Sequence, residues 1–163
     1  MPLLQRLRAD HAPALLAFER ENRAYFAAHI PDRGDDYFAH FDERHRALLD
    51  EQETGTILFH LVVGDGGEVL GRINLIDVEG GSADLGYRIA ERSAGQGLAT
   101  AGVREVCALA AREYGLSSLR AAATVDNAAS QAVLVRTGFT PVGDTELNGR
   151  PAIRFVRDLR DLA

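Results

Sequence analysis

The chain has 163 residues, 46% of them hydrophobic and 26% charged, with a formal net charge of −6. This length and composition predict one globular domain over residues 1–163, with enough chain to bury a core. The acidic balance argues against general nucleic-acid binding, and no apolar run approaches the ~18 residues that a membrane helix needs.

The first third of the chain is expected to hold one strand and two helices. Residues 3–8 alternate enough in polarity for a strand. Asp10 is placed to cap a helix over residues 10–29. After a break rich in turn residues, apolar side chains at helical spacing predict a second helix over residues 35–53.

The middle of the chain reads as a meander of three strands followed by a helix. Residues 56–63, 69–78 and 83–90 are rich in β-forming residues and are separated by glycine-containing turns. A loop over residues 92–97 then opens a helix that runs to about residue 114, where Gly115 ends it.

The last part adds a strand, a helix and a hairpin. A strand over residues 119–125 precedes a helix that Gly138 ends, and strands 139–147 and 151–159 flank an Asn-Gly pair. The fold class is therefore α+β, or mixed α/β: one twisted, mostly antiparallel sheet with a crossover in its middle.

The loop between the third strand of the meander and its helix predicts an anion site. It carries Arg92, Gly95 and Gly97 just before the helix begins. A helix N-terminus exposes unpaired N–H groups and a partial positive charge, and glycines let a backbone approach a phosphate closely. The alternative is a strand-to-helix turn whose glycines serve packing only.

Two other phosphate motifs are excluded by composition and spacing. A P-loop needs a lysine, and the chain contains none. The dinucleotide-binding fingerprint needs a glycine where Thr100 stands and an acid at the end of a following strand, whereas Glu113 falls inside the predicted helix.

Nucleophilic and metal-dependent chemistries also find no support. Asp84 occupies the last position of what would be a Gly-x-Ser-x-Gly elbow, and the five histidines lack ligand spacing, so no metal site is expected. His60 lies within an apolar strand and Cys107 on the apolar side of a helix, so both are expected to be packed core residues.

Three motifs in order resemble those of the GNAT superfamily of N-acetyltransferases. The run from Arg92 to Thr100 resembles its acetyl-CoA motif. Asp126-Asn127-x-x-Ser130 followed by Gly138-Phe139, and Asp84-Leu85-Gly86-Tyr87, resemble signatures of the subgroup of ribosomal-protein N-terminal (alanine/serine) acetyltransferases. The resemblance covers residues 55–159 strongly and residues 1–54 in element order alone. It implies a GNAT-like sheet of about seven strands flanked by helices, splayed between the fourth and fifth strands.

The resemblance also implies how acetyl-CoA would bind. The coenzyme would wedge between strands 83–90 and 119–125, with its pantetheine arm paired to backbone groups of Tyr87, Arg88 and Ile89. Asn127 and Ser130 share one helix face and would line the other wall; a helix cap for Asn127 and a solvent-facing role for Ser130 are the alternatives. Loop amides would hold the pyrophosphate: Arg92, Ser93, Ala94, Gly95, Gln96, Gly97, Leu98, Ala99 and Thr100.

The catalytic groups are less well specified. Ser130 is the candidate for protonating the departing thiolate or hydrogen-bonding to it. Many relatives place a tyrosine in this role further along the helix, whereas here Leu134 stands four residues after Ser130 and no tyrosine follows in the chain. Asp84 is the best candidate base, with a salt bridge or a solvent-facing position as equal alternatives. A backbone N–H freed by a bulge near Gly86 would serve the oxyanion.

Three functions remain open from the sequence: acetylation of a protein N-terminus, acetylation of a small amine such as an antibiotic, polyamine or amino acid, and non-catalytic acyl-CoA binding. The lack of a strong base favours an α-amine, whose pKa near ~7.7–8.0 leaves it partly neutral at pH 7. Four aromatic residues are expected either in the wall of the acceptor groove or in the core: Tyr25, Phe26, Tyr37 and Phe38.

Location and partners follow from broader features. The N-terminus lacks a signal-peptide pattern and the single cysteine excludes an intrachain disulfide, so a cytoplasmic protein is expected. Residues 1–81 hold 8 arginines and 15 carboxylates, a net charge of −7, which either attracts a cationic partner or is a solvated face. An exposed sheet edge is compatible with a homodimer, although no residue pattern demonstrates one.

Overall fold

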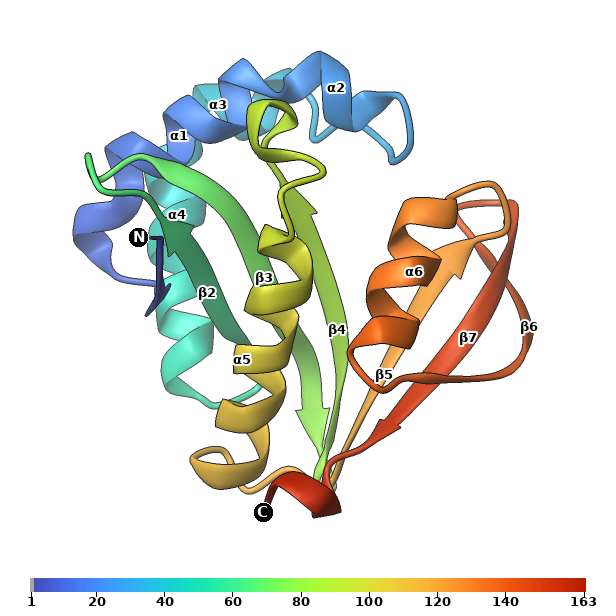
Figure 1. Cartoon of the computed structure of the whole chain (residues 1–163). Coiled ribbons are helices and arrows are strands. Elements are labelled where there is room, and N and C mark those ends of the chain that lie inside the picture. Colours follow the sequence, from blue (N-terminus) through green and yellow to red (C-terminus); the bar gives the residue numbers. More distant parts are fainter. Residues whose placement is uncertain (1) are drawn as a thin grey trace.

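The computed structural model describes residues 2–163, which form one seven-stranded sheet in the order β1-β2-β3-β4-β5-β7-β6 (Figure 1). All neighbouring strands are antiparallel except β4 and β5. The strand bounds are β1 (Leu3–Arg6), β2 (Leu58–Val63), β3 (Val69–Glu79), β4 (Ser82–Ile89), β5 (Ser118–Thr124), β6 (Thr140–Leu147) and β7 (Arg150–Asp158).

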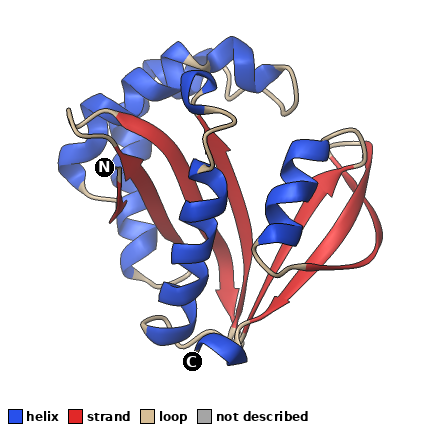
Figure 2. Cartoon of the chain, in the orientation of Figure 1, coloured by secondary structure: helices blue, strands red, loops and turns tan. Residues whose placement is uncertain are grey.

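The helices divide between the two faces of this sheet (Figure 2). Gly102 of α5 packs so closely on Ile73 of β3 that an added Cβ would lie 2.2 Å from its Cδ1 atom. On the opposite face, Glu19 of α1 meets Arg72 of β3. The helices are α1 (Ala12–Glu21), α2 (Arg23–Ala27), α3 (Asp35–Ala39), α4 (Phe41–Glu53), α5 (Leu98–Arg112) and α6 (Ala128–Arg136), with 3₁₀ turns at Ala9–His11, Glu91–Ser93 and Arg160–Leu162.

The prediction of two long, continuous helices near the N-terminus was wrong, because each is interrupted once. The first is interrupted at Asn22, whose buried side-chain amide donates to Phe18 O while its Oδ1 accepts from Glu91 N. Such a side chain competes with the helical backbone for hydrogen bonds, which explains the break. The second is interrupted at His40, whose φ of −117° and ψ of 32° are not helical.

The central strands splay apart as expected. β4 and β5 share only three register pairs, which end at Asp84 and Arg120. Beyond that point β4 stays paired to β3 as far as Ile89, and β5 stays paired to β7 as far as Thr124. Each strand is thus held by its other neighbour, and the facing edges of β4 and β5 are left without a partner strand.

The predicted bulge near Gly86 is wrong. Register pairing between β3 and β4 is continuous from Asp84 to Ile89, and the irregularity lies between Ile76 and Glu79, where Asp77 has a φ of 51°. β4 is therefore a regular strand at this point, and no bulge frees an N–H group near Gly86.

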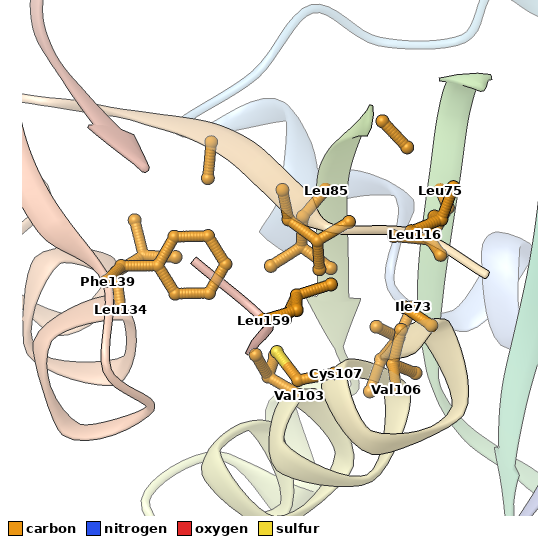
Figure 3. Close-up of a cluster of buried hydrophobic side chains, with 14 of the residues drawn as sticks. Ile73, Leu75, Leu85, Val103, Val106, Cys107, Leu116, Leu134, Phe139 and Leu159 are labelled. Atoms are coloured by element: carbon orange, nitrogen blue, oxygen red, sulfur yellow. The ribbon is translucent and has the colours of Figure 1, made fainter. Parts of the chain in front are cut away.

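The two residues expected in the core are confirmed there. Cys107 is 1% exposed and lies among Val103, Val106 and Leu159 (Figure 3), and burial raises the pKa of its thiol to about 11. His60 is 1% exposed, and burial lowers its pKa to about 4. Its Nδ1 lies 3.1 Å from Ile73 O and its Nε2 2.6 Å from the Tyr114 hydroxyl, so a neutral ring satisfies both partners.

Candidate active site

A first cleft of about 640 Å³, here called the splay cleft, lies beside the unpaired edge of β4. Most of the residues expected to bind the coenzyme line it, and Arg92 and Gln96 do not. Additional lining comes from α2, for which no coenzyme contact was predicted, and from further residues of α6, the helix expected to form the other wall. The predicted residues in the lining are Tyr87, Arg88, Ile89, Ser93, Ala94, Gly95, Gly97, Leu98, Ala99, Thr100, Asn127 and Ser130.

The loop at the end of the splay cleft has the features of an anion site. Gly95 and Gly97 have φ values of 76° and 78°, a region that glycine adopts without strain. Within residues 2–163, the backbone N–H groups of residues 95–97 make no hydrogen bond, and the first-turn N–H groups of α5 have no helical acceptor. Arg136 adds a guanidinium to the same cleft. Free amides, a helix N-terminus and a cation together suit a pyrophosphate.

The edge of β4 offers backbone groups to an extended ligand. The N–H of Ala90 bonds Leu70 O, on the β3 side. Because hydrogen-bonding direction alternates along an antiparallel strand, the N–H and C=O groups of Tyr87 and Ile89 point toward the splay instead. An amide-containing arm such as pantetheine fits this edge as an additional strand would.

A second cleft of about 610 Å³, here called the face cleft, opens on the sheet face opposite α5 and reaches α6 through the splay, at Ser130 and Leu134. Residues of β3, β4, β5 and β7 form its floor, His29, Ile30 and Arg33 line it from the segment after α2, and Asn148 lines it from the β6–β7 turn. Of the four aromatic residues expected in the acceptor wall or the core, Phe26 and Tyr37 are buried core residues.

The two clefts meet at a pair of hydroxyl groups. Tyr87 and Ser130 line both clefts. The Tyr87 hydroxyl lies 2.8 Å from Ser130 Oγ and donates to Ser130 O at 3.2 Å, which links β4 to α6 across the splay. Burial raises the pKa of Tyr87, and its hydrogen bond to Ser130 opposes this effect. The phenol is therefore protonated at neutral pH.

Asn127 has the structural role that was its alternative interpretation. Its Oδ1 accepts from Ser130 N at 3.1 Å and so caps α6. The residue also lines both clefts, so its side-chain NH₂ group stays available there. The cap fixes the orientation of the first turn of α6, which carries Ser130.

Asp84 lies at the closed end of the splay. Its carboxylate accepts from Arg120 Nε at 2.7 Å, and the two residues form the last register pair between β4 and β5. Tyr87 is three residues further along the strand, about 10 Å away. This placement agrees with the salt-bridge interpretation of Asp84.

A buried ionic cluster joins the N-terminal helices to the sheet near both clefts. The Glu19 carboxylate, 1% exposed, accepts from Arg72 at 2.6 Å, Arg33 at 2.9 Å and Arg88 at 3.1 Å. Burial raises the pKa of Glu19, but attraction to the three guanidinium groups outweighs this and holds it below its ordinary value. Arg88 also lies 4.7 Å from the centre of the Phe26 ring.

Several site residues were not identified from the sequence. The hydroxyl of Tyr87 was missed because the family resemblance places the catalytic tyrosine on the helix after Ser130, not on the strand before the glycine loop. Glu19 and Arg33 lie in the first third of the chain, where no motif marks them. Asn74 lines the face cleft, and its Oδ1 is buried without a hydrogen-bond partner within residues 2–163.

The arrangement suits transfer of a group between two ligands that meet at one point. One ligand would carry an anion at the α5 loop, and the other would enter from the opposite face of the sheet. Between them stands a protonated phenol bonded to a serine hydroxyl, and these can supply a proton. Among residues 2–163 there is no cluster of three His, Cys, Asp or Glu able to hold a metal. No helix in that range is long and apolar enough to cross a membrane.

Comparisons with solved structures agree with this geometry. The fold is similar to ribosomal-protein-S5-alanine acetyltransferase from Vibrio fischeri, with a TM-score of 0.91 and 17% identity over 100% of this chain and 99% of that one. The structure of RimJ from Mycobacterium smegmatis in complex with CoA-disulfide matches with a TM-score of 0.86 and 23% sequence identity. The match covers 98% of this chain and 82% of that one. A chimera of the spermidine N-acetyltransferase SpeG from Vibrio cholerae with hSSAT matches with a TM-score of 0.79 and 17% sequence identity. The match covers 99% of this chain and 97% of that one.

A comparison with curated protein sequences gives no match. A family model described as an acetyltransferase (GNAT) domain matches residues 3–140, which is most of the chain. The splayed strands and the glycine loop at the start of α5 lie where the motif resemblance placed them. The chain therefore belongs to the GNAT acetyltransferases and is an acetyl-CoA-dependent N-acetyltransferase.

Proposed function

We propose that this enzyme acetylates the N-terminal α-amine of a protein or peptide by direct attack in a ternary complex. The observation that carries the proposal is the meeting of two separate clefts at Tyr87 and Ser130. The splay cleft suits acetyl-CoA, and the face cleft is open enough for a chain end to enter beside it. Fold similarity to ribosomal-protein acetyltransferases agrees with this acceptor class.

The residues of the splay cleft fit the coenzyme. The amides of residues 95–100 and the guanidinium of Arg136 would hold its phosphates, and the β4 edge at Tyr87 and Ile89 would align its arm. Acetyl-CoA bound there supplies the acetyl thioester that the amine attacks. A free N–H on the same edge is positioned to stabilise the carbonyl oxygen as it gains charge.

Ser130 and Tyr87 would deliver the proton that the departing thiolate needs. Ser130 stands at the junction of the clefts, and the Tyr87 hydroxyl lies 2.8 Å from its Oγ. A proton passing from Ser130 can be replaced from Tyr87 along this hydrogen bond. The tyrosine that the helix lacks at Leu134 would thus be supplied from β4.

The attacking amine needs little help in losing its proton. An α-amine with a pKa near ~7.7–8.0 is partly neutral at pH 7, whereas a lysine amine near ~10.4 is not. Asp84 is held by Arg120, so we assign it to positioning of the closed end of the splay. Glu146, the other carboxylate in the face cleft, makes no ion pair within residues 2–163 and would be the carboxylate free to accept a proton.

The proposal is tested by thiol release from acetyl-CoA across a panel of acceptors. The panel contains short peptides with free N-termini, the same peptides with blocked N-termini, spermidine and free amino acids. We expect turnover with free N-terminal peptides and none with blocked ones. Turnover confined to spermidine or to amino acids would assign a small-molecule acceptor, and coenzyme binding without turnover on any amine would indicate a binding module.

Replacing Gly97 with valine is expected to weaken coenzyme binding by at least about tenfold. A β-branched residue is strained at a φ of 78°, so the loop would relax and turn its N–H groups away from the phosphates. Isothermal titration with coenzyme A measures the loss. Gly55→Val is the matched control, because Gly55 has a φ of 83° but lines neither cleft. Equal coenzyme affinity in wild type and Gly97→Val would mean that the phosphates bind elsewhere.

A cytoplasmic location and a homodimer stay predictions from the sequence. Strands β1 and β6 form the two edges of the sheet, to which a second copy could pair.

A further inference from the structure

The face cleft is electropositive, although the chain as a whole carries a charge of −6. Its charged lining consists of four arginines and two carboxylates: Arg33, Arg88, Arg120, Arg154, Asp84 and Glu146. One of the carboxylates, Asp84, is already neutralised by Arg120. The lining therefore has an excess of two positive charges in a chain whose surface is mostly acidic.

The buried carboxylate behind the cleft does not remove this excess. Glu19 is shared among three guanidinium groups, those of Arg33, Arg72 and Arg88. Burial, with repulsion from Arg33 and Arg72 acting against attraction to Glu19, lowers the pKa of Arg88 to about 10, which still leaves it charged at neutral pH. The side chains of Arg33 and Arg88 keep 27% and 18% of their surface exposed, and each donates only one hydrogen bond within residues 2–163.

Arg154 supplies a cation without an ionic partner on the other side of the cleft. Within residues 2–163 the guanidinium of Arg154 makes no hydrogen bond or ion pair. The residues that face Arg154 on the two neighbouring strands are Ala122 and Gly143. A Cβ at Gly143 would lie 3.1 Å from Arg154 Nη2, so the guanidinium rests directly over that glycine. A register shift in the β6–β7 ladder lies next to this glycine, between Pro141 and Gly143. Small neighbours thus leave the charge uncovered toward the cleft.

We infer that the face cleft selects acceptors whose amine is followed by carboxylate groups, that is, peptides with acidic residues close after the free N-terminus. This inference rests on the proposed function and names the substrate class for the same site. Arg33, Arg88 and Arg154 all line this cleft, where they would receive carboxylates of the chain that follows the amine. A polyamine such as spermidine meets an excess of like charge in the same cleft and is disfavoured.

The test measures peptide binding to the enzyme loaded with coenzyme A, which contains no acetyl group and so permits no turnover. Three short peptides of equal length begin with serine, carry an amidated C-terminus, and continue with Asp-Glu, Asn-Gln or Lys-Arg. We expect the acidic peptide to bind about tenfold more tightly than the basic one, with the neutral peptide between them. Raising the salt concentration should narrow the difference, since these charges are partly exposed.

Two variants separate the cleft from the overall charge of the protein. Arg154→Gln should reduce the preference for the acidic peptide about threefold, the size expected for a partly exposed ion pair. Arg20→Gln removes the same charge from an exposed position outside both clefts and should leave the preference unchanged. Equal effects of the two variants would show that net charge, not the cleft, sets the preference, and would overturn the inference.

Other outcomes are equally decisive. A basic peptide that binds as tightly as the acidic one overturns the inference, whether or not α-amines are acetylated. Tight acidic-peptide binding without thiol release from acetyl-CoA would leave the inference intact and defeat the proposed function. A third outcome is that serine binds more tightly than serinamide while the three peptides bind equally well. The cleft would then recognise the α-carboxylate of a free amino acid, and the inference of an acidic peptide would be overturned.

Discussion

Replacing Ser130 with alanine is expected to lower kcat by about 10²-fold while the affinity for coenzyme A changes little. The hydroxyl stands where the two clefts meet and is hydrogen-bonded to Tyr87, so its loss removes the group that we propose as the proton donor to the thiolate. General acid catalysis typically contributes about 10²–10⁴-fold. Steady-state kinetics with the best acceptor of the panel, together with titration of coenzyme A, separates the two quantities.

Tyr87→Phe completes this experiment. If Tyr87 delivers its proton through Ser130, the two single variants and the double variant should lose similar activity, because removing either member breaks the same chain. Ser117→Ala is the matched control, since Ser117 donates to Gly81 O and lines neither cleft. Unchanged kcat in both Ser130→Ala and Tyr87→Phe would mean that another group protonates the thiolate.

Replacing Glu19 with glutamine is expected to lower the free energy of unfolding by about 3–5 kcal/mol, the usual effect of removing one partner from a buried ion pair. Glutamine keeps the shape but leaves Arg72, whose side chain is 2% exposed, without its carboxylate. Within residues 2–163 the Arg72 Nε already lacks a hydrogen-bond partner, and the bond to Glu19 is the ionic contact that its guanidinium makes. Denaturant titration of both proteins measures the difference.

The stability loss should also depend on pH in a defined direction. The pKa of Glu19 is lowered from its ordinary value of 4.5 in the folded protein, so its ionised form stabilises the fold above that pH. This contribution is lost as the pH falls below 4.5 through the folded-state value. The gap between wild type and Glu19→Gln should therefore be constant at neutral pH and shrink in acid.

Glu21→Gln provides the control for this second prediction. Glu21 is exposed near the end of the same helix, and surface substitutions of this kind usually change stability by less than about 0.5 kcal/mol. Equal unfolding free energies for Glu19→Gln and wild type would contradict the role given to the cluster. Because Arg33 and Arg88 line the face cleft, a weakened cluster should also raise the KM for the acceptor.

The Glu19 cluster explains how distant parts of the chain form one site. Its members come from α1, β3, β4 and the segment after α2. The same carboxylate thus holds the strand that would align the coenzyme and the segment that lines the face cleft. Through Glu19, the segment that carries Arg33 and lines the face cleft is fixed relative to Arg88 of β4.

Much of the fold could be predicted from the sequence, and the exceptions have local causes. The strands, the hairpin at residues 148–149 and the loop before α5 follow from alternation, turn residues and glycines. The first N-terminal helix was predicted too long because Asn22 is compatible with a helix by periodicity alone. Its interruption depends on a hydrogen bond to Glu91 N, 69 residues away, which a local pattern does not contain.

The sequence by itself determined the order of the elements, the glycine loop at the start of α5 and the motifs that point to acetyl-CoA. These depend on backbone requirements within a few neighbouring residues. Only the tertiary structure brought Tyr87 to Ser130, paired Asp84 with Arg120 and gave the face cleft its charge. Tyr87 and Ser130 are 43 residues apart, and Glu19 and Arg72 are 53 residues apart. Such pairs form through strand register and sheet twist, which bring together side chains that no local pattern connects.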